Sequence, residues 1–192
     1  MPEKLRALVI HGTGKNINYV GVPMATTTKS ADFVISRVLD APRDLVWKCF
    51  TDPEHMRQWW GPKGFKVLAS KMDLRVGGTY HYGMSALDGS PMWGKFVYRE
   101  IVPPERLYFI SSFSDEKGGT TRHPGHTSWP LEMHSTFTFE ELPGGKTKFT
   151  VSWAPHNATE EEKKTFEAGR DSMGMGWSGT LEQLEAYLAK AK

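Results

Sequence analysis

A hairpin near the carboxyl end of the chain is the feature that most constrains its fold. In segment 133–142 two phenylalanines alternate with threonines, and in segment 146–153 large apolar residues alternate with Lys, Thr and Ser. The linker 143–145, Pro-Gly-Gly, suits a tight turn. Each strand therefore has one apolar and one polar face, which is typical of an antiparallel sheet covered on one side only.

The same alternation of strands and turns extends upstream over most of the chain. Gly-Gly at 77–78, Asp-Gly at 88–89 and Pro-Pro at 103–104 are turn signals. The polar stretch 114–128 is predicted to be a loop. The pattern predicts a curved antiparallel sheet of about seven strands, at 32–39, 65–75, 79–84, 92–102, 107–113, 133–142 and 146–153.

Two short helices are predicted after the first strand. Pro42 suits the first turn of a helix that extends to about Phe50. Asp52 is a suitable N-cap and Pro53 a suitable first residue for a second helix, which reaches Trp60 before a Gly-Pro pair ends it.

A long amphipathic helix is predicted to close the chain. Thr159 and Glu162 form a capping-box pattern at its start. One face then carries apolar residues at helical spacing, namely Phe166, Met173, Trp177, Leu181, Leu184 and Leu188. Glycines interrupt this helix at a cost of ~4 kcal/mol relative to alanine, at Gly169, Gly174, Gly176 and Gly179. That cost predicts a kink, or a close approach to the sheet, near the helix middle.

Composition excludes several classes of protein. A net charge of +2 with 24% charged residues is too balanced for a dedicated nucleic-acid or membrane-surface binder. No stretch approaches the roughly 18 consecutive apolar residues of a transmembrane helix. The single cysteine, Cys49, excludes an intramolecular disulfide and is expected to be a buried thiol. The start of the chain lacks secretory-signal features, so a cytoplasmic location is expected.

Several short segments carry a resemblance to a known family. They are RVLDAP at 37–42, VW at 46–47, TDPEH at 51–55, WWGP at 59–62, DLRVGG at 73–78, IVPPERL at 101–107 and GW at 176–177. In this order and spacing they resemble the START-like superfamily (SRPBCC, or Bet v 1-like). The branch they resemble consists of homologues of the activator of heat-shock protein 90 ATPase. The resemblance covers about residues 32–190.

This resemblance implies an α+β helix-grip fold, in which the sheet wraps around the C-terminal helix and leaves a cavity. Members include lipid and steroid carriers, cyclases and stress-linked proteins, and a shared fold does not decide among them. The leading hypothesis is binding of a hydrophobic, aromatic or lipid-like small molecule by a monomer or homodimer. Two alternatives stay open: a cofactor-free cyclase or hydrolase using polar cavity residues, and a stress-response or chaperone-associated interaction module.

The candidate ligand-binding residues are large side chains expected to face the space between sheet and helix. One tryptophan of the pair at 59–60 is expected to pack under the sheet rim and the other to line the cavity mouth. Tyrosine supplies a ring for apolar contact and a hydroxyl that can orient a polar ligand group. The predicted set is Trp60, Tyr80, Tyr82, Phe137, Trp153, Met173 and Trp177.

The sequence contains few patterns that are typical of catalytic or metal-binding sites. His123 and His126 have HxxH spacing, but Pro and Gly between them prevent a helix. Acid–base chemistry would need polar side chains facing the cavity, with Asp73, Arg75, His81 and Glu132 as candidates. A surface or rim ion pair is favoured for Asp73 and Arg75. We therefore predict no catalytic residue, no metal site and no cofactor, and favour binding without catalysis.

Residues 1–30 are predicted to be an N-terminal extension that precedes a domain at 31–192. Segment 5–10 has the pattern of one short strand, and glycines and prolines then break any continuation. The stretch 12–16 fails as a phosphate-binding loop, because Val9 and Asn16 occupy positions that need Gly and Ser or Thr.

Deleting residues 1–23 is expected to change stability little, because this segment brings few large apolar groups. Thermal unfolding of the truncated chain measures the effect. A drop in melting temperature above about 8 °C, worth roughly 2–4 kcal/mol for a chain of this size, would instead mean that the segment adds a strand or fills the cavity.

Overall fold

The computed structural model describes residues 32–86 and 88–191. The predicted strand at 5–10 and the stretch 12–16 lie outside the described residues. The strands are β1 (Phe33–Leu39), β2 (Lys66–Met72), β3 (Thr79–Ser85), β4 (Pro91–Val102), β5 (Arg106–Ser114), β6 (Thr120–Thr121), β7 (Glu132–Leu142) and β8 (Lys146–His156). The helices are α1 (Arg43–Thr51), α2 (Pro53–Trp59), α3 (Glu160–Ala168) and α4 (Arg170–Leu188).

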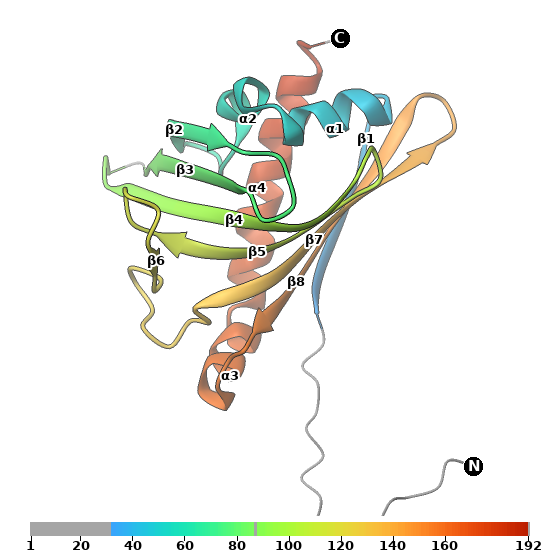
Figure 1. Cartoon of the computed structure of the whole chain (residues 1–192). Coiled ribbons are helices and arrows are strands. Elements are labelled where there is room, and N and C mark those ends of the chain that lie inside the picture. Colours follow the sequence, from blue (N-terminus) through green and yellow to red (C-terminus); the bar gives the residue numbers. More distant parts are fainter. Residues whose placement is uncertain (1–31, 87, 192) are drawn as a thin grey trace, which may run out of the picture.

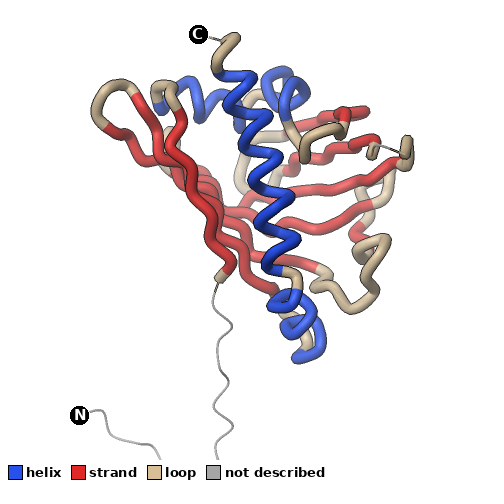
Figure 2. Tube along the Cα trace, turned by 180° about the vertical axis from the view of Figure 1, so that it is seen from behind, coloured by secondary structure: helices blue, strands red, loops and turns tan. Residues whose placement is uncertain are grey.

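One antiparallel sheet holds all eight strands. Its order is β1-β8-β7-β5-β4-β3-β2, and the two-residue β6 pairs only with β5. Register shifts between Val67 and Ala69 in β2, and between Tyr98 and Glu100 in β4, mark irregularities of the kind that bend strands. The sheet curves around α4, which crosses its concave face (Figures 1 and 2). The predicted α+β helix-grip fold is confirmed.

The strand pattern differs from the prediction in one loop. Stretch 114–128, predicted to be without secondary structure, contains β6, where Thr120 and Thr121 pair with Ser114 and Phe113. A strand of two residues is too short to show alternation in the sequence, and it pairs with the end of β5 that extends beyond the pairing with β7.

The predicted long C-terminal helix is two helices. The predicted capping box is present, because Thr159 Oγ1 accepts from the Glu162 backbone N–H and Glu162 accepts from that of Thr159. α3 then ends at Gly169. A Cβ built on Gly169 would lie 2.9 Å from the Trp129 ring, so this glycine allows a close approach. None of the described helices has the length and apolar character needed to cross a membrane.

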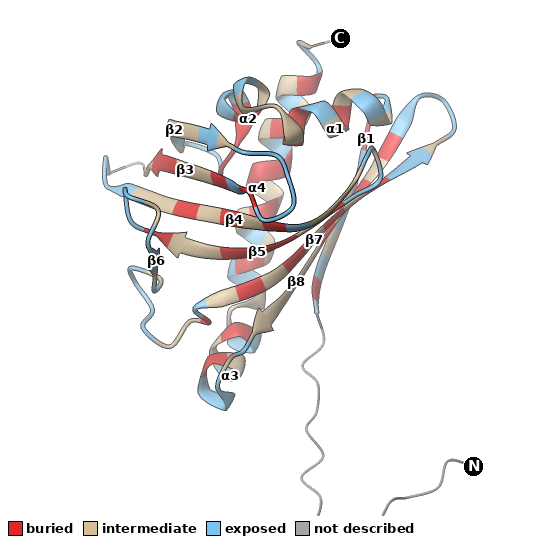
Figure 3. Ribbon diagram, in the orientation of Figure 1, coloured by how far each residue is buried: buried red, intermediate tan, exposed pale blue. Residues whose placement is uncertain are grey.

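The core lies on the concave face of the sheet. In β7 and β8 the buried residues alternate with partly exposed ones, as the hairpin pattern predicted (Figure 3). Phe137 pairs with Val151, and Phe139 with Phe149, across the hairpin. Phe139 and Phe149 are at most 2% exposed. The apolar face of the hairpin is therefore a wall of the core.

The two short helices close one end of this core. The Asp52 side chain accepts from the Glu54 backbone N–H at 2.9 Å, and Pro53 begins α2, as predicted. Phe50 of α1 stacks on Phe149, with ring centroids 4.5 Å apart, and is 2% exposed. Cys49 is buried, as predicted, and burial raises the pKa of its thiol to about 12. These contacts fill the space between sheet and helices at this end.

Candidate functional site

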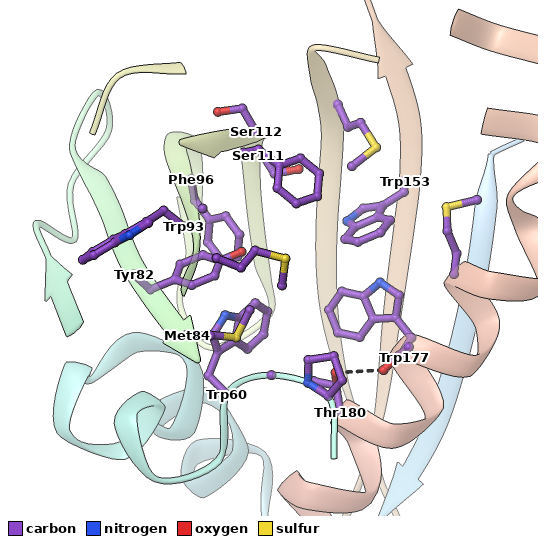
Figure 4. Close-up of a pocket in the computed structure, with 18 residues that line it drawn as sticks. Trp60, Tyr82, Met84, Trp93, Phe96, Ser111, Ser112, Trp153, Trp177 and Thr180 are labelled. Atoms are coloured by element: carbon purple, nitrogen blue, oxygen red, sulfur yellow. Dashed lines mark hydrogen bonds between the residues drawn. The ribbon is translucent and has the colours of Figure 1, made fainter. Parts of the chain in front are cut away.

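A pocket of about 200 Å³ lies between α4 and the concave face of the sheet. Aromatic rings and methionines dominate its wall (Figure 4). The linker after α2 supplies Trp60, Gly61 and Pro62; β3 supplies Tyr82 and Met84; β4 supplies Met92, Trp93, Gly94 and Phe96; β5 supplies Ser111, Ser112 and Phe113; β7 and β8 supply Met133 and Trp153; α4 supplies Met173, Gly176, Trp177 and Thr180.

Hydrogen bonds to α1 and to α4 hold the tryptophan pair at 59–60 and the turn after it in place. The Trp59 indole N–H donates to the Cys49 carbonyl oxygen at 3.1 Å, so this ring belongs to the core. The Gln183 side-chain amide of α4 donates to the carbonyl oxygens of Gly61 at 2.9 Å and Pro62 at 3.3 Å. Gly61 has φ +113°, a conformation that favours glycine. The turn thereby presents Trp60 to the pocket.

Edge-to-face contacts arrange the tryptophans of the wall. The Trp60 ring meets Trp177 at 5.9 Å between centroids, and Trp177 meets Trp153 at 5.2 Å. Both pairs have T-shaped geometry, which aromatic rings prefer over face-to-face stacking. The pocket therefore has a rigid aromatic side formed by three separate elements.

Tyr82 is the ionisable residue of the wall. Burial raises the pKa of Tyr82 to about 12, against a smaller lowering by the neighbouring Trp60 indole. The hydroxyl lies over Gly94, where an added Cβ would be 2.5 Å from the Tyr82 oxygen. Glycine at position 94 therefore makes room for this phenol, which stays uncharged near neutral pH.

The other polar side chains of the wall are mostly engaged. The Ser111 and Ser135 hydroxyls share a hydrogen bond of 2.7 Å, and Thr180 Oγ1 donates to the Gly176 carbonyl oxygen at 2.9 Å. The residues that line the pocket in the described structure include no Asp, Glu, Lys, Arg or His. A wall of this kind favours an apolar, uncharged molecule, because an unpaired buried charge is strongly destabilising.

The structure brings together most of the residues predicted as a binding site. Trp60, Tyr82, Trp153, Met173 and Trp177 all line the pocket. Two predicted residues do not, and both are at most 1% exposed in the core. They are Tyr80, whose hydroxyl accepts from Ser70 at 3.4 Å, and Phe137, which packs on Phe50 and Trp177.

Several wall residues were missed by the sequence prediction. Met84 is in phase with Tyr82 on β3, and Thr180 lies one helical turn after Trp177, so strand and helix spacing could have found both. Phe96 lies opposite Tyr80 in the register of β3 and β4. Nothing in the local sequence distinguishes Met92 from other residues at the start of a strand.

Of the four glycines expected to allow a kink or a close approach, Gly169 and Gly179 lie close to other segments of the chain. A Cβ on Gly174 or Gly176 would meet nothing within 4 Å, whereas one on Gly179 would lie 3.4 Å from the Lys63 backbone nitrogen.

The pocket is smaller than the roughly 300–1,000 Å³ expected for a drug-sized ligand. Engineered cavities near 150 Å³ hold a benzene molecule, so this volume suits a molecule of one or two rings.

The candidate acid–base residues lie away from the pocket. Asp73 and Arg75 form an exposed ion pair at 2.9 Å, as predicted. Neither residue lines the pocket, and the same holds for His81 and Glu132. His81 lies beside the Asp115 carbonyl oxygen at 3.1 Å.

The histidines of the described chain are spread over several places. His123 and His126 lie in the loop after β6, with ring centroids 5.0 Å apart. Burial and the neighbouring His126 lower the pKa of His123. Within residues 32–86 and 88–191, no group of three or more His, Cys, Asp or Glu side chains is arranged to hold a metal ion.

A curved antiparallel sheet around a C-terminal helix, with an apolar pocket between them, defines a helix-grip protein of the SRPBCC (START-like) superfamily. Within this superfamily, the chain belongs to the family described as Activator of Hsp90 ATPase homolog 1-like protein, whose model matches residues 40–189. The predicted resemblance is confirmed. No curated protein matches the chain.

Solved bacterial structures resemble this chain over most of its length. A solution structure from Arthrobacter aurescens has TM-score 0.67 and 27% identity, covering 84% of this chain and 87% of that one. Crystal structures from Mycobacterium smegmatis (TM-score 0.64, 25% identity, 82% and 90% covered) and Chromobacterium violaceum (0.60, 27%, 81% and 95%) are also similar.

Proposed function

We propose that this protein binds a small hydrophobic, aromatic molecule in the pocket between the sheet and α4. The observation that carries the proposal is the wall itself: a pocket of about 200 Å³ lined by aromatic and methionine side chains without an acidic, basic or histidine residue. Ligand pockets are typically concave, largely apolar and furnished with few polar groups. Methionine adds a flexible surface that adapts to different ring shapes.

The wall gives less support to catalysis. General acid–base chemistry works best with a group whose pKa lies near the working pH. Tyr82 is the ionisable candidate in the wall, and burial moves its pKa upward to about 12, away from that range. Binding therefore agrees better with the residues present than a cyclase or hydrolase does.

Titration with the neutral two-ring fluorescent probe 1-aminonaphthalene tests the proposal. We expect saturable binding at a 1:1 ratio with quenching of tryptophan emission, because Trp60, Trp153 and Trp177 form part of the wall. Native mass spectrometry of freshly purified protein serves as an independent search for a retained small molecule.

Failure of both measurements would overturn the proposal. A folded protein that neither binds the probe nor retains a small molecule would leave the outer surface as the functional region. That result would favour the chaperone-associated or stress-response interaction module.

A further inference from the structure

Three buried indole groups in the pocket wall, those of Trp60, Trp153 and Trp177, lack a hydrogen-bond partner, and the Trp60 ring lies against Tyr82. The Nε1 atoms of Trp153 and Trp177 are closed off from water, and neither donates to any residue that the structure describes. The two rings are in edge-to-face contact on the β8–α4 side of the pocket (Figure 4). Trp177 as a whole is only 5% exposed.

Such donors are unusual in a folded protein. Most buried polar groups have at least one partner, because an unpaired donor loses its hydrogen bonds to water and gains nothing in return. The Ser111 and Thr180 hydroxyls also line the pocket, but neither accepts from these indoles; Ser111 is bonded to Ser135, and Thr180 donates to the Gly176 carbonyl oxygen. An acceptor for the indoles would have to come from a molecule that enters the pocket and displaces the atoms now covering the two nitrogens.

The same wall restricts the charge of that molecule. A carboxylate would be a good acceptor, but the described lining supplies no cation to pair with it. Two indole N–H groups carry no net charge and do not compensate the loss of water around an ion. A neutral acceptor such as a carbonyl or ether oxygen avoids this penalty.

We propose that the pocket selects an uncharged one- or two-ring aromatic molecule with a hydrogen-bond acceptor, which accepts from the indole N–H groups of Trp153 and Trp177. This inference rests on the proposed function and names the ligand class of the same pocket. The rings of Trp60 and Trp177 supply the aromatic surface, and the two indole nitrogens supply the polar recognition.

Three ligands of similar size separate these contributions: acetophenone, its hydrocarbon isostere α-methylstyrene, and benzoate. Each is titrated against the protein with bound 1-aminonaphthalene, and displacement gives its Kd. The variants Trp153→Phe and Trp177→Phe keep a ring and remove the N–H. The free energy of transferring a ligand from water is the same for every variant. It therefore cancels when the Kd values of one ligand are compared between variants.

We expect each variant to weaken acetophenone binding about ten-fold, as loss of one buried hydrogen bond implies. The Kd of α-methylstyrene should change by less than about two-fold, and benzoate should not displace the probe. Trp129→Phe is the matched control, because Trp129 also has an unpaired buried indole nitrogen but does not line the pocket. This variant should leave all three affinities unchanged.

Two results would overturn the inference while leaving the proposed function intact. One is an equal loss of acetophenone and α-methylstyrene affinity in the tryptophan variants, which would mean that the rings act by shape alone. The other is benzoate binding as tight as that of acetophenone. Absence of probe binding to the unmodified protein, together with no retained small molecule in native mass spectrometry, would reject the proposed function and the inference together. Trp153 is only partly buried, so Trp153→Phe keeps the test valid if Trp177→Phe fails to fold.

Discussion

Replacing Gly176 by leucine is expected to abolish ligand binding while the protein remains folded. Gly176 lines the pocket from α4, and a Cβ built there meets nothing within 4 Å, so the new side chain enters the pocket without a clash. Leucine also favours a helix over glycine by roughly 1 kcal/mol. We expect probe affinity to fall by about two orders of magnitude, equivalent to ~2.7 kcal/mol, with unchanged or increased thermal stability.

Gly174→Leu provides a control within the same helix. Gly174 also leaves open space around an added Cβ, but it does not line the pocket. Its substitution should give a similar gain in stability and leave probe affinity within about two-fold of the original. Equal loss of binding in both variants would mean that the helix, rather than the filled pocket, controls binding. Unchanged binding in Gly176→Leu would place the ligand elsewhere.

Replacing Phe50 by alanine is expected to cause the largest loss of stability, about 3–5 kcal/mol. Phe50 is 2% exposed and makes ring contacts with Trp59, Phe137, Phe139 and Phe149 at centroid distances of 4.8, 5.3, 5.2 and 4.5 Å. Its removal leaves a cavity between α1 and the hairpin that surrounding rings cannot fill. Urea unfolding gives the free energy, and the melting temperature should fall by about 10 °C.

Phe65→Ala is the comparison for this measurement. Phe65 is only partly buried and packs at the edge of the same core, so we expect a loss of about 1–2 kcal/mol. Similar losses in the two variants would contradict a core centred on Phe50.

Local patterns predicted most of the elements, because each element has its own chemical signature. Asp52 before Pro53, and Thr159 three residues before Glu162, are helix starts whose bonds form within a few residues. The 143–145 turn sets the hairpin register, and alternation then decides which residues face inward. Such features need little information from the rest of the chain.

The boundaries of the pocket depend on contacts between distant segments. Tyr80 and Tyr82 share one face of β3, yet only Tyr82 lines the pocket. Position along the strand relative to α2 and α4 separates them, and periodicity carries no such information. The close approach at Gly169 likewise involves Trp129, which lies far away in the sequence. Residue spacing predicts which face of a strand or helix a side chain lies on. Whether that position along the element borders the pocket depends on how the elements pack in the folded chain.

The two halves of α4 differ in how firmly their side chains hold them against the rest of the protein. Leu181, Leu184 and Leu188 are at most 2% exposed and fix the second half, which Gln183 also ties to the turn after α2. The first half carries Gly174 and Gly176, and glycine gives a helix little resistance to local opening. We therefore expect the half of α4 that borders the pocket to separate from the sheet more readily than the half fixed by the three leucines. The ligand proposed for this pocket would then exchange by a local movement of this segment while the phenylalanine core stays intact.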